Sequence, residues 1–215
     1  MDIIEIRDVS KRFGEHVVLN RVTACFQRGN IYGIVGRNGS GKTVLLECIC
    51  GLTHQDEGTI IVNGKEIGKN IDMAENIGII IETPGFLPNY SGFRNLQFLM
   101  GVSKKVNSSV ISAAMELVGL NPRDKKKIGK YSLGMRQRLG IAQAIMENPD
   151  ILILDEPMNG LDAAGVEDVR NILLNMKKQG KTILLASHNK EDIQVLCDEV
   201  YKIEDGKLKV QNREQ

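Results

Sequence analysis

The chain lacks several features that mark particular protein classes. It has no tryptophan and only 4% aromatic residues, which argues against a nucleic-acid surface built from stacked aromatic rings. Its 28 Lys+Arg balance 27 Asp+Glu, so neither a strongly basic nucleic-acid binder nor an acidic tail is expected. No apolar run approaches the roughly 18–20 residues that cross a bilayer, and the N-terminus lacks a signal-peptide pattern. We therefore expect a soluble, intracellular, near-neutral globular protein.

The four cysteines have no metal-binding or redox spacing. Cys48 and Cys50 would point in different directions on a helix, and Cys25 and Cys197 stand alone. We expect all four to be small buried hydrophobic side chains in a reducing compartment, rather than disulfides or metal ligands.

Apolar periodicity divides the 215 residues into an α/β part and a helical part. Strands are predicted at 3–9, 22–26, 31–35, 59–62, 76–81, 151–154 and 182–186, with two more around Asp205-Gly206. Helices are predicted at 43–50, after Ser91, at 109–118, 134–146 and 163–178, with a short one after 186. Between 86 and 148 the strand signals vanish. This order predicts an α/β core with a helical insertion at about 86–148.

A glycine-rich segment follows the buried strand pattern at 31–35. Gly36-Arg37-Asn38-Gly39-Ser40-Gly41-Lys42-Thr43 fits the pattern G-x-x-x-x-G-K-[ST] and opens a predicted helix. The glycines allow a tight turn whose N–H groups face inward, and the helix N-terminus adds more N–H donors. Lys42 is expected to reach the β- and γ-phosphates, and the Thr43 hydroxyl to bind Mg²⁺. The sequence therefore predicts a nucleoside triphosphate site.

An apolar strand ends in two carboxylates at Asp155 and Glu156, followed by Pro157. Acids at a strand end are common on solvated surfaces, but beside a phosphate loop they suit NTP hydrolysis. Asp155 suits an Mg²⁺ ligand, and Glu156 suits the base that orients or deprotonates water.

Three further segments carry a family resemblance. Tyr131-Ser132-Leu133-Gly134-Met135-Arg136-Gln137-Arg138 resembles the signature motif LSGGQ-x-QR of ATP-binding-cassette (ABC) ATPases. Asn159-Gly160-Leu161-Asp162 resembles their D-loop, and Ser187-His188 their switch histidine. The match follows the family's motif order along essentially the whole chain. The segments 82–86 and 131–135 make it most similar to the ATPase subunits of bacitracin and lantibiotic export and immunity transporters.

The resemblance implies a P-loop NTPase fold. It comprises a RecA-like core with an antiparallel β part and an inserted α-helical subdomain, within a single ABC ATPase domain spanning 1–215. Two chains would form a head-to-tail homodimer with ATP and Mg²⁺ between one phosphate loop and the other chain's residues 132–135. Ser132, Gly134 and His188 would contact the γ-phosphate, and Asp162 would link the two sites. Phe13 occupies the position where the family stacks an aromatic ring on adenine, whereas His16 and His54 are interpreted as surface residues.

The chain departs from the family pattern at three positions. Leu133 and Met135 replace a glycine and a glutamine of the signature, while the glycine that approaches phosphate is kept as Gly134. Glu82 stands where the family has a glutamine that senses Mg²⁺, water and the transporter. We therefore assign it as a candidate metal ligand with Thr43 and Asp155; binding of a basic interdomain partner and an ordinary acid at a strand end are the alternatives.

The resemblance implies ATP hydrolysis, with Glu156, His188 and Lys42 as catalytic residues, that powers export of an antimicrobial peptide or drug. A separate polytopic membrane permease would supply the pore, so this chain would sit on the cytoplasmic face of the cell membrane. It would contact the membrane only through the permease, and no nucleic-acid partner is expected. Two alternatives are a non-transport ATPase acting on DNA or ribosomes and a non-catalytic regulatory cassette. The substrate, the transport direction and pairing with a different cassette stay open.

Overall fold

The computed structural model describes residues 2–82, 85–103 and 105–211. Within these ranges, six strands form a central sheet in the order β10-β9-β3-β8-β7-β6. The pairs from β9 to β6 are parallel, and β10 joins β9 antiparallel. The strands are β3 (Ile31–Val35), β6 (Ile77–Ile80), β7 (Ile151–Asp155), β8 (Thr182–Ala186), β9 (Glu199–Glu204) and β10 (Lys207–Gln211).

The central sheet is covered on both faces. In β7, Ile151 and Ile153 enter one hydrophobic core, while Leu152 and Leu154 enter a second core on the opposite face. This explains the uninterrupted apolar run of the strand, because parallel strands between two layers have no solvent-facing side.

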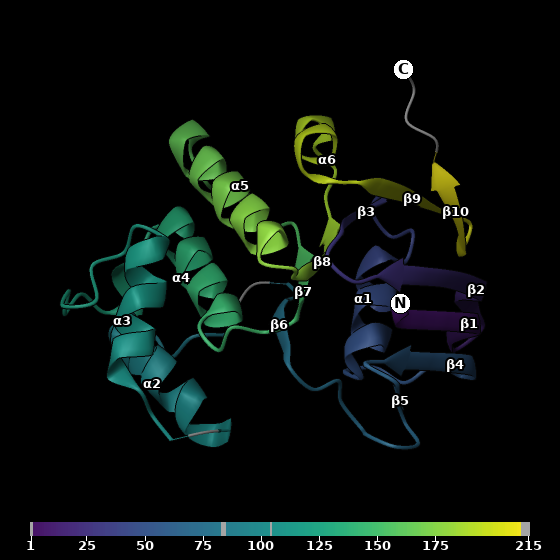
Figure 1. Ribbon diagram of the computed structural model, residues 1–215, viewed down its shortest axis with the longest axis horizontal. Coiled ribbons are helices and arrows are strands. Elements are labelled where there is room, and N and C mark those ends of the chain that lie inside the picture. The colour runs from purple at the N-terminus through teal and green to yellow at the C-terminus, as the bar shows by residue number, and fades with distance from the viewer. Residues whose placement is uncertain (1, 83–84, 104, 212–215) are drawn as a thin grey trace.

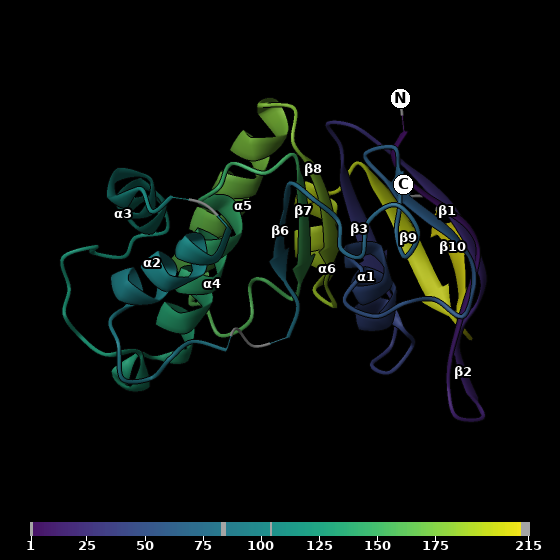
Figure 2. The ribbon, with the colours of Figure 1, turned by 90° about the horizontal axis from the view of Figure 1, so that it is seen from below.

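A second, antiparallel sheet packs beyond one face of the central sheet. Its order, over the residues that are described, is β2-β1-β4-β5. Helix α1 (Lys42–Cys50) lies between the two sheets (Figure 2), and its buried apolar side chains belong to the same core as those of β1 and β2. The strands are β1 (Asp2–Phe13), β2 (His16–Gln27), β4 (Glu57–Val62) and β5 (Lys65–Glu66).

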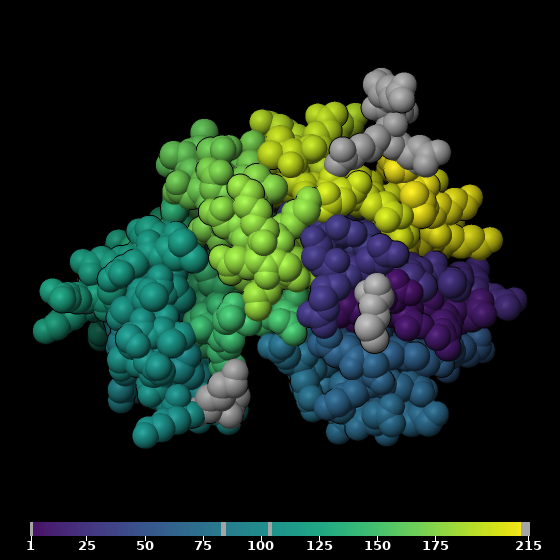
Figure 3. Space-filling view, viewed as in Figure 1, coloured from purple at the N-terminus to yellow at the C-terminus, as the bar shows by residue number. Residues whose placement is uncertain are grey.

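Helices cover the other face and form a lobe beside the sheets (Figures 1 and 3). They are α2 (Gly92–Ser103), α3 (Ser108–Leu117), the short 3₁₀ turn η1 (Ile128–Lys130), α4 (Leu133–Ile145), α5 (Ala163–Lys178) and α6 (Lys190–Leu196). None of the described helices is both long and apolar enough to cross a bilayer. The predicted P-loop-type α/β fold with an antiparallel β part is confirmed.

Local signals fix several element ends as predicted. Gly51 ends α1 in the left-handed region at φ 79°, with its N–H bonded to the Cys48 carbonyl. Asn63 and Gly64 both have positive φ, 50° and 76°, which is the geometry of the tight hairpin turn between β4 and β5. The Ser91 hydroxyl accepts a bond from the Arg94 N–H at 3.3 Å and so caps α2.

The prediction that all four cysteines are buried is wrong for Cys25. Cys48, Cys50 and Cys197 are buried, but Cys25 is exposed. It lies on β2 between the buried side chains of Ala24 and Phe26, so strand alternation turns it toward solvent. Burial raises the pKa of Cys48 to about 12 and that of Cys50 to about 12.

Candidate functional site

The strand order brings three loops to one edge of the central sheet. β3 pairs with β8, and β8 with β7, all parallel. The phosphate loop follows β3, Asp155 and Glu156 end β7, and His188 follows β8. Because the carboxyl ends of parallel strands meet at the same edge, these residues converge there, where open α/β sheets bind their ligands.

The phosphate loop requires its glycines. Gly39 and Gly41 have φ 77° and 102°, in the left-handed region that side chains disfavour. A Cβ on Gly36 would lie 2.6 Å from both the Ile203 carbonyl oxygen and the Ser40 hydroxyl. Side chains at Gly36, Gly39 and Gly41 would therefore be strained or would clash, so the loop requires glycine at these positions.

Lys42 folds back over this loop. Its Nζ donates to the carbonyl oxygens of Gly36 at 2.9 Å and Arg37 at 3.2 Å, and the residue is only 7% exposed. The Ser40 hydroxyl is buried with no hydrogen-bond partner among the described residues. An ammonium held by two loop carbonyl oxygens beside a buried hydroxyl suits the binding of phosphate oxygens, which accept hydrogen bonds from both kinds of donor.

Thr43 and Asp155 meet although they are far apart in sequence. The Thr43 hydroxyl donates to Oδ2 of Asp155 at 2.6 Å. A hydroxyl and a carboxylate side by side at a phosphate loop fit the oxygen ligands that Mg²⁺ prefers. Glu82, the third predicted metal residue, follows β6 with an exposed side chain and φ 59°, and it does not line the pocket described below.

Glu156 is held by the loop that follows β8. Its Oε1 accepts the backbone N–H of His188 at 3.1 Å and lies 2.8 Å from Nδ1 of the same residue. The Glu156 side chain is 22% exposed. This contact fixes the direction of a carboxylate that remains accessible to water, as a general base requires.

A pocket of about 450 Å³ joins these groups to the β1–β2 hairpin. Phe13, 53% exposed, lines it together with His16 and Val18. Its remaining lining residues are Asn38, Gly39, Gly41, Lys42, Thr43, Val44, Asp155 and Glu156. The ring is therefore not part of the hydrophobic core, and its exposed face is accessible from the pocket. Sequence reasoning missed His16 and Val18, although their place just after Phe13 in the same hairpin was a usable signal.

The signature segment, residues 131–138, lies outside this pocket. Ser132 caps α4 by accepting the Met135 N–H at 3.2 Å, and Asp162 caps α5 by accepting the Gly165 N–H at 3.0 Å. Figures 1 and 2 place α4 and α1 on opposite sides of the central sheet. Ser132, Gly134 and Asp162 do not line the pocket formed by the phosphate loop of their own chain.

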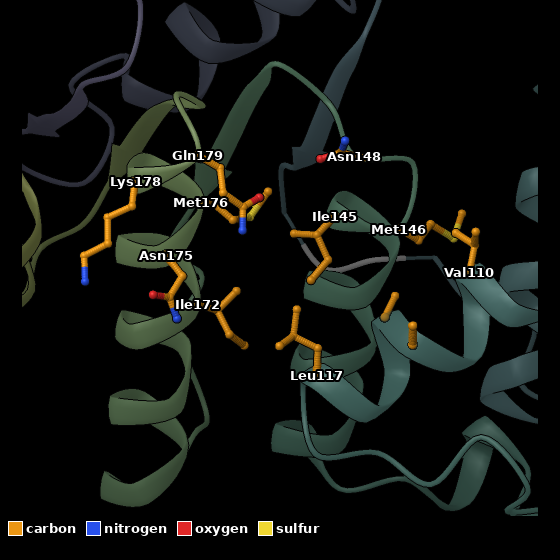
Figure 4. Close-up of a pocket in the computed structure, with 12 residues that line it drawn as sticks. Val110, Leu117, Ile145, Met146, Asn148, Ile172, Asn175, Met176, Lys178 and Gln179 are labelled. Atoms are coloured by element: carbon orange, nitrogen blue, oxygen red, sulfur yellow. The ribbon is translucent and has the colours of Figure 1, made fainter.

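A larger hollow of about 570 Å³ lies between α3, α4 and α5. Leu117, Ile145 and Ile172 point toward one another across it, and Asn175 and Gln179 stand at its edge (Figure 4). Its lining includes no glycine-rich loop and no acidic residue, so it is not the nucleotide site.

The comparisons agree with this geometry. The family model described as "ABC transporter" matches residues 19–159. The ABC transporter ATP-binding protein YybJ of Bacillus subtilis (strain 168), itself uncharacterized, is 43% identical over 98% of this chain and 97% of its own. The bacitracin transport ATP-binding protein BcrA of Enterococcus faecalis is 40% identical, over 96% of this chain and 68% of its own.

The fold is also that of a solved cassette. A dimeric structure of the ATP-binding cassette MJ0796, bound to ADP and Pi, superimposes with a TM-score of 0.87 at 20% identity, over 99% of both chains. The family match and the two relatives show that the chain belongs to the ABC transporter ATP-binding family, in agreement with a glycine-rich loop, an acidic strand end and a histidine at one sheet edge.

Proposed function

We propose that this chain hydrolyses ATP and thereby drives export of a peptide antibiotic through a separate membrane subunit. The observation that carries the hydrolytic part is Glu156, held by His188 at the edge of a pocket that also contains Lys42 and Asp155. The relative named for bacitracin transport supports the cargo class.

Each residue proposed for the site, including His188 and Glu82 outside the pocket lining, has a separate task. Phe13 stacks on adenine, and the loop N–H groups and Lys42 bind the phosphates. Thr43 and Asp155 would hold Mg²⁺, which would neutralise charge on the phosphoryl group. Glu156 orients water for in-line attack, and His188 fixes the Glu156 carboxylate and contacts the γ-phosphate. Glu82 completes the metal surroundings or contacts the permease.

A second copy of the chain completes the site. Ser132 caps α4, which lies on the far side of the sheet from α1, and it does not line the pocket of its own chain, which supports a role for its N-terminal donors at the nucleotide of a partner. Asp162, at the start of α5 in the adjoining loop, links the two sites. ATP therefore closes a head-to-tail homodimer, and hydrolysis opens it.

The face presented by α2 and the loop before it is the proposed contact for the permease on the inner side of the cell membrane. Tyr90 and Phe98 are 45% and 37% exposed and pack edge to face, with ring centroids 5.1 Å apart. Arg94 lies 4.9 Å from the Phe98 ring centroid, and the side chain of Leu87 is 48% exposed beside them. Exposed aromatic residues next to an arginine are typical of binding surfaces. Together with α3 and α4, this segment forms the helical subdomain of a single ABC ATPase domain.

ATPase activity measured over a range of protein concentrations tests the proposal. Because two chains build each site, the specific activity should rise with concentration until the dimer saturates. Lys42→Ala is the control, since it should weaken ATP binding itself. No phosphate release at any concentration would refute the hydrolytic role. Isolation from its native host with ribosomes or DNA, rather than with a membrane subunit, would refute the transport role and favour the non-transport alternative.

A further inference from the structure

Gln137 is a buried amide in the first half of α4 whose partners lie in the loop of Glu156. The residue is 9% exposed. Its Nε2 donates to the Pro157 carbonyl oxygen at 2.8 Å and lies 3.4 Å from the Glu156 carbonyl oxygen. Because a buried carbonyl without a partner is costly, these contacts fix two successive peptide groups next to the proposed catalytic base.

The backbone at Glu156 needs such support. Its φ of 49° is left-handed, a conformation that a non-glycine residue rarely adopts, and the following proline restricts it further. Its N–H donates to the Ala186 carbonyl at 2.9 Å, and its carbonyl accepts the Asn159 N–H at 3.2 Å. Gln137 adds a side-chain donor on the carbonyl side of the same residue, and surrounding contacts of this kind keep a strained conformation in place.

The start of the same helix also lies against this loop. A Cβ on Gly134 would lie 2.9 Å from the Gly160 carbonyl oxygen, and a Cβ on Gly160 would lie 2.5 Å from the Leu133 side chain. The helix that begins at Ser132 therefore meets the segment 156–160 at two points. The start of α4 is therefore packed against the loop that carries Glu156.

We infer that Gln137 is a positioning residue that holds Glu156 of its own chain in the orientation for hydrolysis. It thereby couples that base to the helix that serves the partner's nucleotide. The inference rests on the proposed function of Glu156.

Gln137→Met keeps the side-chain length but removes the donor, so kcat should fall about tenfold while KM for ATP stays within about twofold. Gln143→Met, a substitution on the same helix outside this contact, is the matched control and should change neither parameter.

Mixed dimers with two affinity tags separate positioning from general damage. One chain carries Glu156→Gln, so only the other has an intact base. Gln137→Met in the chain with intact Glu156 should slow single-turnover hydrolysis about tenfold, whereas the same substitution in the Glu156→Gln chain should change it less than about twofold. Equal slowing in both dimers, or slowing in the second alone, would overturn the inference.

Amide exchange of the nucleotide-free chain gives a readout without catalysis. The Asn159 amide should exchange about tenfold faster in Gln137→Met than in Gln143→Met, because its acceptor is the Glu156 carbonyl. An unchanged Asn159 rate would overturn the inference even if activity fell. A wild-type chain without ATPase activity would refute the proposed function instead, and the exchange result would still decide the role of Gln137 in fixing the loop.

Discussion

Replacing Arg170 by methionine should destabilise the fold severely. Arg170 lies on α5, with a side chain that is 8% exposed, and it faces Asp192 on α6, whose side chain is 1% exposed. Its Nε and Nη2 donate to the same Asp192 oxygen at 2.9 Å and 2.6 Å. The hydrogen bonds of Glu191 and Asp192 raise the pKa of Arg170 above its ordinary value, so the guanidinium stays charged.

The magnitude follows from what Arg170→Met leaves behind. Asp192 would be a buried carboxylate without its counter-charge, and breaking a buried pair in this way costs about 3–5 kcal/mol. The outer partners, Glu167 and Glu191, are 64% and 68% exposed, and exposed ion pairs contribute little. The loss therefore comes almost entirely from Asp192. It is a large part of the roughly 5–15 kcal/mol by which a domain is stable.

Equilibrium urea unfolding of the wild type and of Arg170→Met measures this difference. The matched control is the double variant Arg170→Met/Asp192→Leu, which replaces the pair by two apolar side chains and should recover most of the lost free energy of unfolding. A loss below about 1 kcal/mol in the single variant, or no recovery in the double variant, would refute the reasoning.

Three further predictions concern the pocket and the thiols. Glu156→Gln should bind ATP normally, but its kcat should fall by about 10²–10⁴, or roughly 3–5 kcal/mol, because the amide keeps the shape of the side chain and loses the base. Phosphate release measures this loss, and retention of most of the rate would place the base elsewhere. Phe13→Ala should weaken ATP binding by about 1–3 kcal/mol, and Phe13→Trp should restore it, as nucleotide titration would show. Equal ATP affinities of the wild type and Phe13→Ala would contradict the stacking role. Iodoacetamide should label Cys25 of the native chain at pH 8.5 before Cys48 or Cys50, because burial raises the pKa of the latter two to about 12. Mass spectrometry identifies the labelled site, and early labelling of Cys48 would contradict the described packing.

Much of the fold follows from local patterns. Gly51 ends α1 because glycine adopts the left-handed region without strain, and Asn63-Gly64 turns a hairpin for the same reason. The alternating burial in β2 follows from the strand period of two, and applying that period would have placed Cys25 outside. The motif order was sufficient to assign the family, which the comparisons confirm.

Local patterns do not reveal which distant side chains meet. Thr43 and Asp155 are separated by 112 positions, and Glu156 and His188 by 32, yet each pair lies within hydrogen-bond distance. Nothing in the motif that contains Gln137 predicts that its side-chain amide donates to the Pro157 carbonyl oxygen. These contacts depend on strand order and helix packing, which many distant residues decide together.

The sequence by itself therefore predicted the residues of the candidate site: a glycine-rich loop, two carboxylates and a histidine, each at the end of a predicted strand. The tertiary structure alone decided their geometry. It placed β8 between β3 and β7, so that the three loops share one edge, and it set α4, the helix that Ser132 caps, on the opposite side of the sheet from α1. The physical reason is that dihedral preference and periodicity are local properties, whereas strand order is settled by the burial of two cores at once.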